Sequence, residues 1–312
     1  MSVEFCGLTL AHPVVNGSGT FDALAARGVF GDEQLRERFP FSAYVSKTIT
    51  LEPRAGNPPP RLWEAPAGLV NSIGLPNKGL ERYISEDLPQ LAELLGGPEG
   101  RPGGGAPVPL ITNVMGASAE ELTLLLEACD AQAQIAAVEL NVSCPNVRTG
   151  LDIGADPRQL EDVVRAVRAA TGKPLIVKLT PNTADVSACA LAAEAGGADA
   201  VSLINTLRAM ALAPRAGAPR GGGAGEGAPW LGGGTGGLSG PAIRAVALAQ
   251  VAAVAARVEI PVIGMGGVQS SAHAQDLLDV GATLVAVGTE SFRDPAAGAR
   301  VARGLQPFAA RI

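Results

Sequence analysis

The stretch VELNVSCPN, residues 138–146, joins a short apolar strand to a polar turn, and the same arrangement recurs along the chain. The apolar run ends at Asn141, and a turn that contains Cys144 and Pro145 follows it. Short runs of apolar and β-branched residues that are bounded by turn residues are typical of buried strands. The stretch therefore predicts one strand of a buried sheet, with polar side chains at its carboxyl end.

Seven other segments repeat this pattern, which gives eight predicted strands: Val14–Asn16, Tyr44–Lys47, Leu110–Asn113, Val138–Asn141, Leu175–Lys178, Val201–Asn205, Val262–Gly264 and Leu284–Gly288. Helical spacing of Ala and Leu lies between them, at Glu120–Ala131, Pro157–Ala170, Thr183–Ala195, Gly240–Ala256 and Ser271–Val280. Alternating strands and helices pair in parallel through right-handed crossovers. Eight units in 312 residues predict an α/β fold, a closed (β/α)8 TIM barrel that forms a single domain over residues 1–312.

Three segments do not follow the alternation. VEFCGLTL at 3–10 predicts a short N-terminal β-hairpin that caps the bottom of the barrel. The Gly/Pro-rich segments 96–109 and 207–234 predict long loops, which we place at the C-terminal face. The letters GGGTGG at 232–237 match a dinucleotide fingerprint, but they follow a loop and not a strand, so we do not assign an NAD site to them.

Composition excludes several classes of function. The net charge of −6 and the scattered Lys and Arg residues leave no basic face for nucleic acid. The chain offers neither a basic leader followed by an apolar run nor about 20 uninterrupted apolar residues, so we expect a cytoplasmic protein without a membrane span. The four cysteines form no CxxC pair and the two histidines are far apart, which argues against a disulfide framework and a metal or iron–sulfur site.

Polar residues gather at the predicted strand ends, where barrel enzymes place their active sites. Lys47 and Lys178 put two cations at this rim, which favours an anion or an electron-rich ring as the ligand. GMGG at 264–267 and Gly288-Thr289 follow the last two strands. Glycine turns at this position let backbone N–H groups approach a phosphate, although they could also be simple tight turns.

Lys178 has two further interpretations. It could be an ion-paired core lysine, but no acidic residue ends a neighbouring predicted strand. It could also be the amine of a Schiff-base aldolase, because lysines on barrel strands can act as nucleophiles when their pKa is depressed. The sequence pattern by itself leaves the aldolase open.

Cys144 differs from the other cysteines. A lone cysteine is usually a small buried hydrophobe, and Cys6, Cys129 and Cys189 fit that description. Cys144 stands before a proline, which favours an extended loop conformation, and its neighbours are polar. A nucleophilic role would need a histidine base, and neither histidine falls at a facing strand end. We therefore interpret Cys144 as a general base, since a thiol with a pKa of about 8.5 can ionise beside a cation.

Many ordered motifs in the chain resemble one family. They are NGSGTF at 16–21, SKTIT, EPRAGNPPPR, NSIGLPN, TNVMG, ELNVSCPN, VKLTPN, INT, TGGLSGPAI, GMGGV and AVGTESF, which ends at 292. Together they resemble the class 1 dihydroorotate dehydrogenases, flavin enzymes of pyrimidine (UMP) synthesis on a (β/α)8 barrel. The resemblance spans almost the whole chain, apart from 207–234, which departs in composition.

The resemblance implies that the chain binds FMN and oxidises (S)-dihydroorotate to orotate. Cys144 would take the proton from C5 while hydride passes from C6 to flavin N5. FMN would be held by Ser18, Lys47, Thr48, Asn113, Asn141, Lys178, Ile204, Gly240, Gly266, Gly267, Gly288 and Thr289, the last four at the phosphate. The substrate would be held by Lys47, Asn71, Ser72, Ile73, Gly74, Leu75, Asn141, Asn146, Asn205 and Thr206.

The resemblance also implies partners. TGGLSGPAI, INT and GMGGV are similar to the 1B type, a homodimeric core that passes electrons to NAD through a subunit with FAD and a [2Fe-2S] cluster. NSIGLPN is closer to the 1A type, a homodimer that reduces fumarate. The serine base and N-terminal membrane segment of class 2 enzymes are not found in the sequence. A flavin-binding subunit without catalytic activity is a further possibility.

Overall fold

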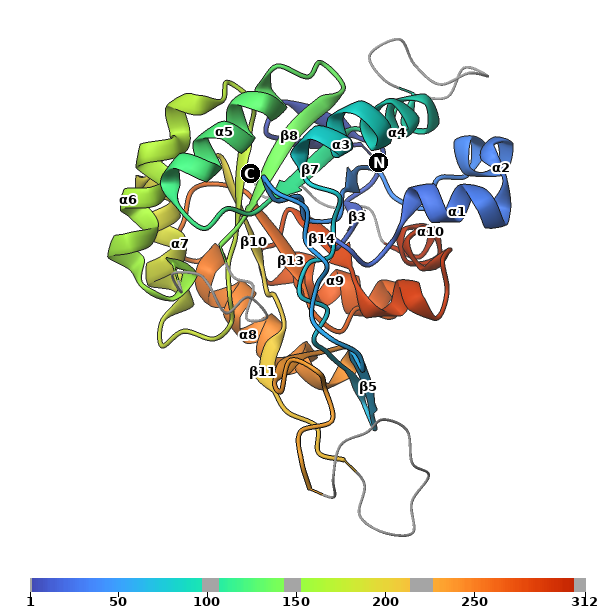
Figure 1. Cartoon of the computed structure of the whole chain (residues 1–312), viewed down its shortest axis with the longest axis vertical. Coiled ribbons are helices and arrows are strands. Elements are labelled where there is room, and N and C mark those ends of the chain that lie inside the picture. The colour runs from blue at the N-terminus through green and yellow to red at the C-terminus, as the bar shows by residue number, and fades with distance from the viewer. Residues whose placement is uncertain (1, 97–106, 143–152, 214–226, 306–312) are drawn as a thin grey trace.

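The computed structural model describes residues 2–96, 107–142, 153–213 and 227–305. Eight parallel strands form one sheet in the order β3-β14-β13-β10-β9-β8-β7-β4, with helices around it (Figure 1). The strands are β3 (Val14–Asn16), β4 (Tyr44–Val45), β7 (Leu110–Val114), β8 (Ile135–Asn141), β9 (Leu175–Lys178), β10 (Ala200–Leu203), β13 (Val262–Met265) and β14 (Leu284–Val287). All eight agree with the predicted strands to within a few residues, and the predicted (β/α)8 barrel is confirmed.

A side chain completes the barrel between its first and last strands. Asn16 at the end of β3 is fully buried, and its amide bonds both backbone groups of Val45 on β4, each at 2.8 Å. The Ser42 N–H also donates to the Val14 carbonyl, at 3.0 Å. Asn16 thus supplies the hydrogen bonds that a backbone ladder supplies elsewhere in the sheet.

The helices surround the sheet, and the five predicted segments correspond to α5, α6, α7, α8 and α9. They are α1 (Ala23–Phe30), α2 (Asp32–Glu37), α3 (Leu80–Arg82), the π-helix η1 (Tyr83–Asp87), α4 (Leu88–Leu95), α5 (Ala119–Asp130), α6 (Pro157–Val167), α7 (Val186–Ala195), α8 (Arg244–Ala255), α9 (Ser271–Asp279) and α10 (Ala297–Arg303). Short 3₁₀ turns lie at η2 (Ile153–Ala155), η3 (Arg168–Ala170), η4 (Pro241–Ile243) and η5 (Thr289–Phe292). Side chains cap several amino ends: Ser118 accepts from Glu121 N–H, and Asp156 accepts from Arg158 and Gln159 N–H.

The barrel interior has an apolar lower part. Inward-facing residues such as Val15, Ile111, Ile176 and Ile263 form a compact cluster together with Phe5 and Leu10. These last two belong to an antiparallel hairpin of β1 (Val3–Phe5) and β2 (Leu8–Leu10). The Cys6 thiol bonds the Asp199 carbonyl, just before β10 begins, so the hairpin closes the amino-terminal end of the barrel as predicted.

A second sheet corrects one prediction. β11 (Leu207–Ala209), β12 (Gly236–Ser239), β6 (Gly68–Asn71) and β5 (Leu62–Ala65) form an antiparallel sheet in that order. We call this sheet, with the described residues 210–213 and 227–235, the arm, because the sheet projects from the barrel in Figure 1. The described ends of segment 207–234 are therefore not simply loop: they include β11 and an antiparallel bridge between Leu212 and Pro229. Segment 96–109 begins at the C-cap Gly96, and its residues 97–106 lie outside the described ranges.

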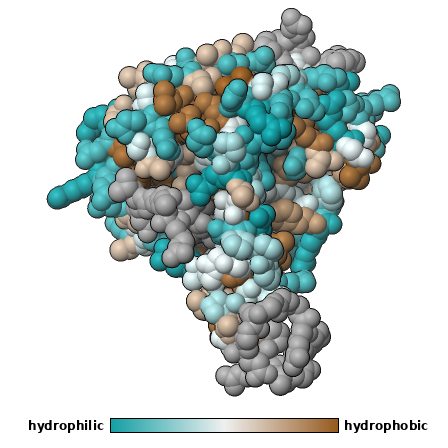
Figure 2. Space-filling model, in the orientation of Figure 1, coloured by the Kyte–Doolittle hydropathy of each residue, from teal (hydrophilic) through white to brown (hydrophobic). Residues whose placement is uncertain are grey.

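The surface seen in Figure 2 is mostly hydrophilic, with apolar residues in small groups. None of the helices in the described ranges combines the length and the hydrophobicity needed to cross a bilayer.

Candidate functional site

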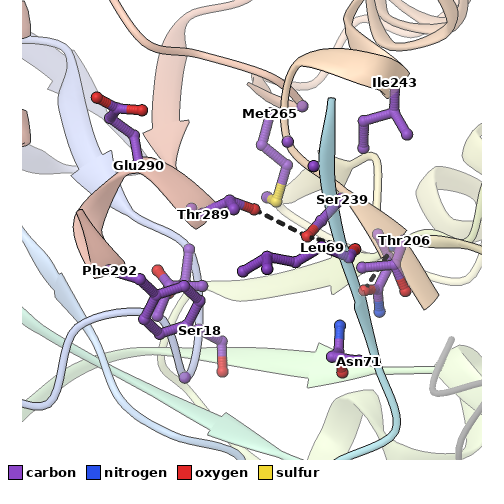
Figure 3. A pocket seen from close by; sticks show the side chains of 18 of the residues that line it. Ser18, Leu69, Asn71, Thr206, Ser239, Ile243, Met265, Thr289, Glu290 and Phe292 are labelled. Carbon is purple, nitrogen blue, oxygen red and sulfur yellow. Dashed lines mark hydrogen bonds between the residues drawn. The ribbon is translucent and has the colours of Figure 1, made fainter. Parts of the chain in front are cut away.

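A cavity of about 620 Å³ lies at the carboxyl ends of the barrel strands. Its floor and walls come from the barrel, through residues such as Lys47, Asn141 and Lys178. The arm contributes Leu69 and Asn71 of β6 and Ser239 of β12, and in Figure 3 the Leu69 side chain lies between the Met265 and Ser18 sides of the cavity. The arm therefore covers part of a site that the barrel by itself would leave more open.

Most residues that the sequence predicted for the site line this cavity. They are Ser18, Lys47, Thr48, Asn71, Ile73, Gly74, Leu75, Asn141, Lys178, Ile204, Asn205, Thr206, Gly240, Gly266, Gly267, Gly288 and Thr289. Asn113 and Ser72 are fully buried outside the cavity wall. Cys144 and Asn146 lie outside the described residues, although Asn141, three positions before Cys144, is in the wall.

Lys47, Lys178 and Arg293 bring positive charge to the cavity, which Glu64 and Glu290 also line. Lys178 is only 6% exposed, whereas Lys47 is exposed toward the cavity. Within the part of the chain that the structure describes, neither ammonium group forms an ion pair or a hydrogen bond. A buried cation without a partner is unfavourable, so the arrangement suits a ligand that carries negative charge or electron-rich oxygens.

The glycine turn after β13 has the shape of an anion site. Gly266 and Gly267 have φ angles of 136° and 70°, which side chains rarely adopt. A Cβ at Gly267 would lie 2.7 Å from Arg244 Cβ, and one at Gly266 would lie 2.6 Å from Ala247 Cβ. The turn thus packs directly on the first residues of α8, where backbone N–H groups and the helix dipole favour an anion.

The turn after β14, the neighbour of β13 in the sheet, lies at the same end of the barrel. Thr289 begins η5, and its hydroxyl donates to the Ser239 hydroxyl at 2.8 Å, as the dashed line in Figure 3 shows. Gly240, Gly267 and Gly288 line the cavity around this pair. Backbone and hydroxyl groups from three separate turns therefore converge, which supports the predicted phosphate position.

A buried carboxylate below the cavity was missed by the sequence reasoning, which considered only residues at strand ends. Glu139 lies two residues before the end of β8, and it is 2% exposed. Side chains alternate along a strand, so Glu139 shares the inward face of Ala137 and Asn141. It bonds Asn113 and, at 2.7 Å, the Ser202 hydroxyl. The alternation of inward and outward side chains, followed two residues back from Asn141, would have identified Glu139 as an inward-facing residue.

The apolar part of the wall was missed as well. Leu69, Ile243, Met265 and Phe292 line the cavity, and Figure 3 shows the Met265 sulfur directed toward its middle. Phe292 is 59% exposed at the rim. An apolar lining with a few convergent polar groups is typical of sites for cofactors and other small molecules. Apolar residues carry no chemical signal in a sequence, and only their position in the fold identifies them.

Cysteines and metal ligands give no second site. The three described cysteines are free, and burial is the main cause that raises the pKa of Cys6 to about 11 and that of Cys129 to about 12. In the described ranges, no group of three His, Cys, Asp or Glu side chains could hold a metal ion.

Comparisons with known proteins agree with this geometry. The family model described as dihydroorotate dehydrogenase matches residues 1–308. A protein of Trichlorobacter lovleyi named dihydroorotate dehydrogenase B (NAD(+)), catalytic subunit, is 42% identical over 313 residues, which cover 99% of this chain and 93% of that protein. Proteins of the same name from Desulforudis audaxviator and Geotalea daltonii are 41% and 40% identical, and the alignments cover 98% and 100% of this chain and 92% and 93% of those proteins.

Proposed function

Because the chain belongs to the dihydroorotate dehydrogenase family, we propose that it is the catalytic subunit of an NAD-linked enzyme that oxidises (S)-dihydroorotate to orotate in pyrimidine synthesis. The observation that carries the proposal is the cavity, where two lysines that form no ion pair with the described residues face apolar walls and glycine turns, in a chain that matches the family over 308 residues. The aldolase interpretation of Lys178 has no comparable support.

The residues around the cavity fit FMN. The glycine turn after β13 suits its phosphate, because it packs so closely on α8 that a Cβ at Gly266 or Gly267 would collide with the helix. Gly288 and Thr289 of the turn after β14 line the same cavity. Ile204 and Met265 offer apolar surface to a flat ring, and Lys178 and Lys47 offer positive charge. When bound, FMN would supply a hydride acceptor for the C6 position of the substrate. The FMN residues predicted from the sequence stay part of the proposal, with Asn113 acting from below the cavity wall.

The substrate would lie beside the same cations. Asn71, Asn141 and Asn205 line the cavity, and their amides suit a pyrimidine ring that alternates hydrogen-bond donors and acceptors. Lys47 suits the carboxylate. Cys144 is proposed as the base for the C5 proton, with Asn146 as a further substrate contact. A positioned base contributes about 10²–10⁴ in rate.

The electron acceptor follows from the relatives. They carry the name of an NAD(+)-dependent catalytic subunit, which supports a second, electron-transferring subunit more than direct reduction of fumarate. We propose that this partner holds FAD and a [2Fe-2S] cluster and docks on a homodimer of the present chain. A cytoplasmic location and a single FMN-binding barrel domain over residues 1–312 complete the proposal.

Anaerobic reduction tests the proposed function. The purified protein should be yellow and should lose its visible absorption when dihydroorotate is added. Cys144→Ser should keep the flavin and bleach about 10²–10⁴ times more slowly. Cys189→Ser is the matched control, because Cys189 is fully buried outside the cavity wall. The flavin of this variant should bleach at the normal rate. A colour that persists with dihydroorotate, or borohydride trapping of a substrate on Lys178, would contradict the dehydrogenase.

A further inference from the structure

Glu139 is a buried acid that the proposed reaction does not use. It is 2% exposed and points into the barrel from β8, one inward position below Asn141 of the cavity wall. The apolar cluster that fills the lower barrel begins one inward position further down, at Ala137. Glu139 therefore lies in a polar layer between the apolar core and the floor of the cavity.

Both side-chain oxygens of Glu139 have a hydrogen-bond partner. One carboxylate oxygen accepts from the Asn113 amide and the other accepts from the Ser202 hydroxyl at 2.7 Å. Both partners are neutral, and no ion pair to Glu139 is found among the described residues. Two donors, one to each oxygen, suit an ionised carboxylate, which can only accept.

Lys178 is the nearest cation by strand order. β9 is the neighbour of β8, and Lys178 stands in register with Asn141 on one side and with Ser202 on the other. Ser202 is the residue whose hydroxyl bonds Glu139. The carboxylate thus lies below the ammonium, and both are neighbours of Ser202, although no ion pair between them is found among the described residues.

Charges buried inside the barrel act over a longer distance than charges at the surface. Glu139 and Lys178 are both at least 94% buried, so water and salt screen them weakly. Lys178 faces the cavity and favours any ligand that gains negative charge there. Glu139, beneath it, opposes that effect. On the premise of the proposed flavin function, we propose that Glu139 lowers the reduction potential of the flavin by offsetting the charge of Lys178.

The consequence concerns the acceptor. A flavin held only beside a buried cation would retain its electrons more strongly, because the reduced ring carries more negative charge than the oxidised ring. A carboxylate fixed below the cavity makes the reduced cofactor a better donor to a weak oxidant such as NAD. Glu139 is then a positioning residue for electron transfer, which acts through its field and does not touch the substrate.

The test is the midpoint potential of the flavin in the holoenzyme, measured anaerobically against a redox dye. Glu139→Gln removes the charge and keeps the shape, and it should shift the ratio of reduced to oxidised flavin at a fixed dye potential at least tenfold toward reduced, which is about 30 mV for two electrons. Glu139→Met should shift it in the same direction and serves where the Gln variant does not fold. Glu139→Asp, which keeps the charge, should stay within threefold of the wild type.

Two controls separate the possible outcomes. Ser202→Ala removes a hydrogen bond but no charge, so its shift should be smaller than that of Glu139→Gln. Lys178→Met should move the potential in the opposite direction. A potential that is unchanged in both neutral variants, or equal shifts in the Gln and Asp variants, would overturn the inference while the wild-type flavin still bleaches with dihydroorotate. A wild-type protein that binds no flavin would instead refute the proposed function.

Discussion

Asn16→Ala should strongly destabilise the barrel at its seam, where β3 meets β4. The Asn16 amide forms two 2.8 Å hydrogen bonds with the backbone of Val45, and alanine would leave that buried N–H and C=O without partners. Each buried group without a partner costs about 1–3 kcal/mol, so we expect a loss of roughly 2–6 kcal/mol. That is a large fraction of the 5–15 kcal/mol that is typical of a folded domain.

Urea denaturation followed by circular dichroism measures this loss, with Ser42→Ala as the matched control. Ser42 is buried at the same seam, and its hydroxyl donates to the Val14 carbonyl at 3.0 Å. Its own backbone N–H donates to the same oxygen, also at 3.0 Å, so the control leaves that carbonyl satisfied and should cost only about 0.5–1.5 kcal/mol. If Asn16→Ala is no more destabilising than Ser42→Ala, the side chain does not close the barrel and the reasoning is wrong.

Three other changes test the cavity, the thiols and the arm. Gly267→Ala must place a side chain at φ 70° and 2.7 Å from Arg244 Cβ, so flavin affinity measured by fluorescence should fall at least tenfold, whereas Gly7→Ala, at φ 79° with open space around it, should leave it unchanged. At pH 8 the Cys6 thiol, whose pKa is raised to about 11 by burial and by Asp199, should be about one-thousandth ionised. Iodoacetamide should therefore label it far more slowly than in the denatured protein, and equal rates in a mass-spectrometric assay would contradict that shift. Trp63→Ala removes an edge-to-face contact with Trp230, at 5.2 Å between ring centroids, so the Ala213 and Trp230 amides of the arm should exchange hydrogen faster while barrel amides do not change.

The barrel was predictable because its strands are local and unambiguous. Leu175–Lys178 is a continuous apolar run that ends in a charge, and the strand is observed at those bounds. Strands buried on both faces leave this pattern in any sequence, and the helical segments between them fix the parallel order. The polar strand ends could be placed in one cavity for the same reason, since the fold brings all the carboxyl ends of its strands to one face.

The arm was not predictable from the same signals. β12 begins at Gly236-Gly237, just after segment 207–234, which was predicted as a loop, and these glycines were not predicted to form a strand. In the structure these glycines are required by close packing, because a Cβ at Gly237 would lie 1.9 Å from the Thr206 hydroxyl and one at Gly236 would lie 2.3 Å from the Asn71 carbonyl. The partner strand β6 is more than 160 positions away in the sequence, and residues this far apart leave no periodic pattern.

The cavity floor shows a second limit of reading strand ends. The sequence reasoning found no acid at the end of a strand beside Lys178 and concluded that the lysine needs an external anion. The cation does face the cavity without an ion pair in the described chain, but the structure adds Glu139 one layer below it. Glu139 forms no ion pair with Lys178, but its negative charge acts against the positive charge of the lysine. The charge that a ligand meets is therefore the sum over two layers of the barrel, and a strand's terminal residue shows only the upper one.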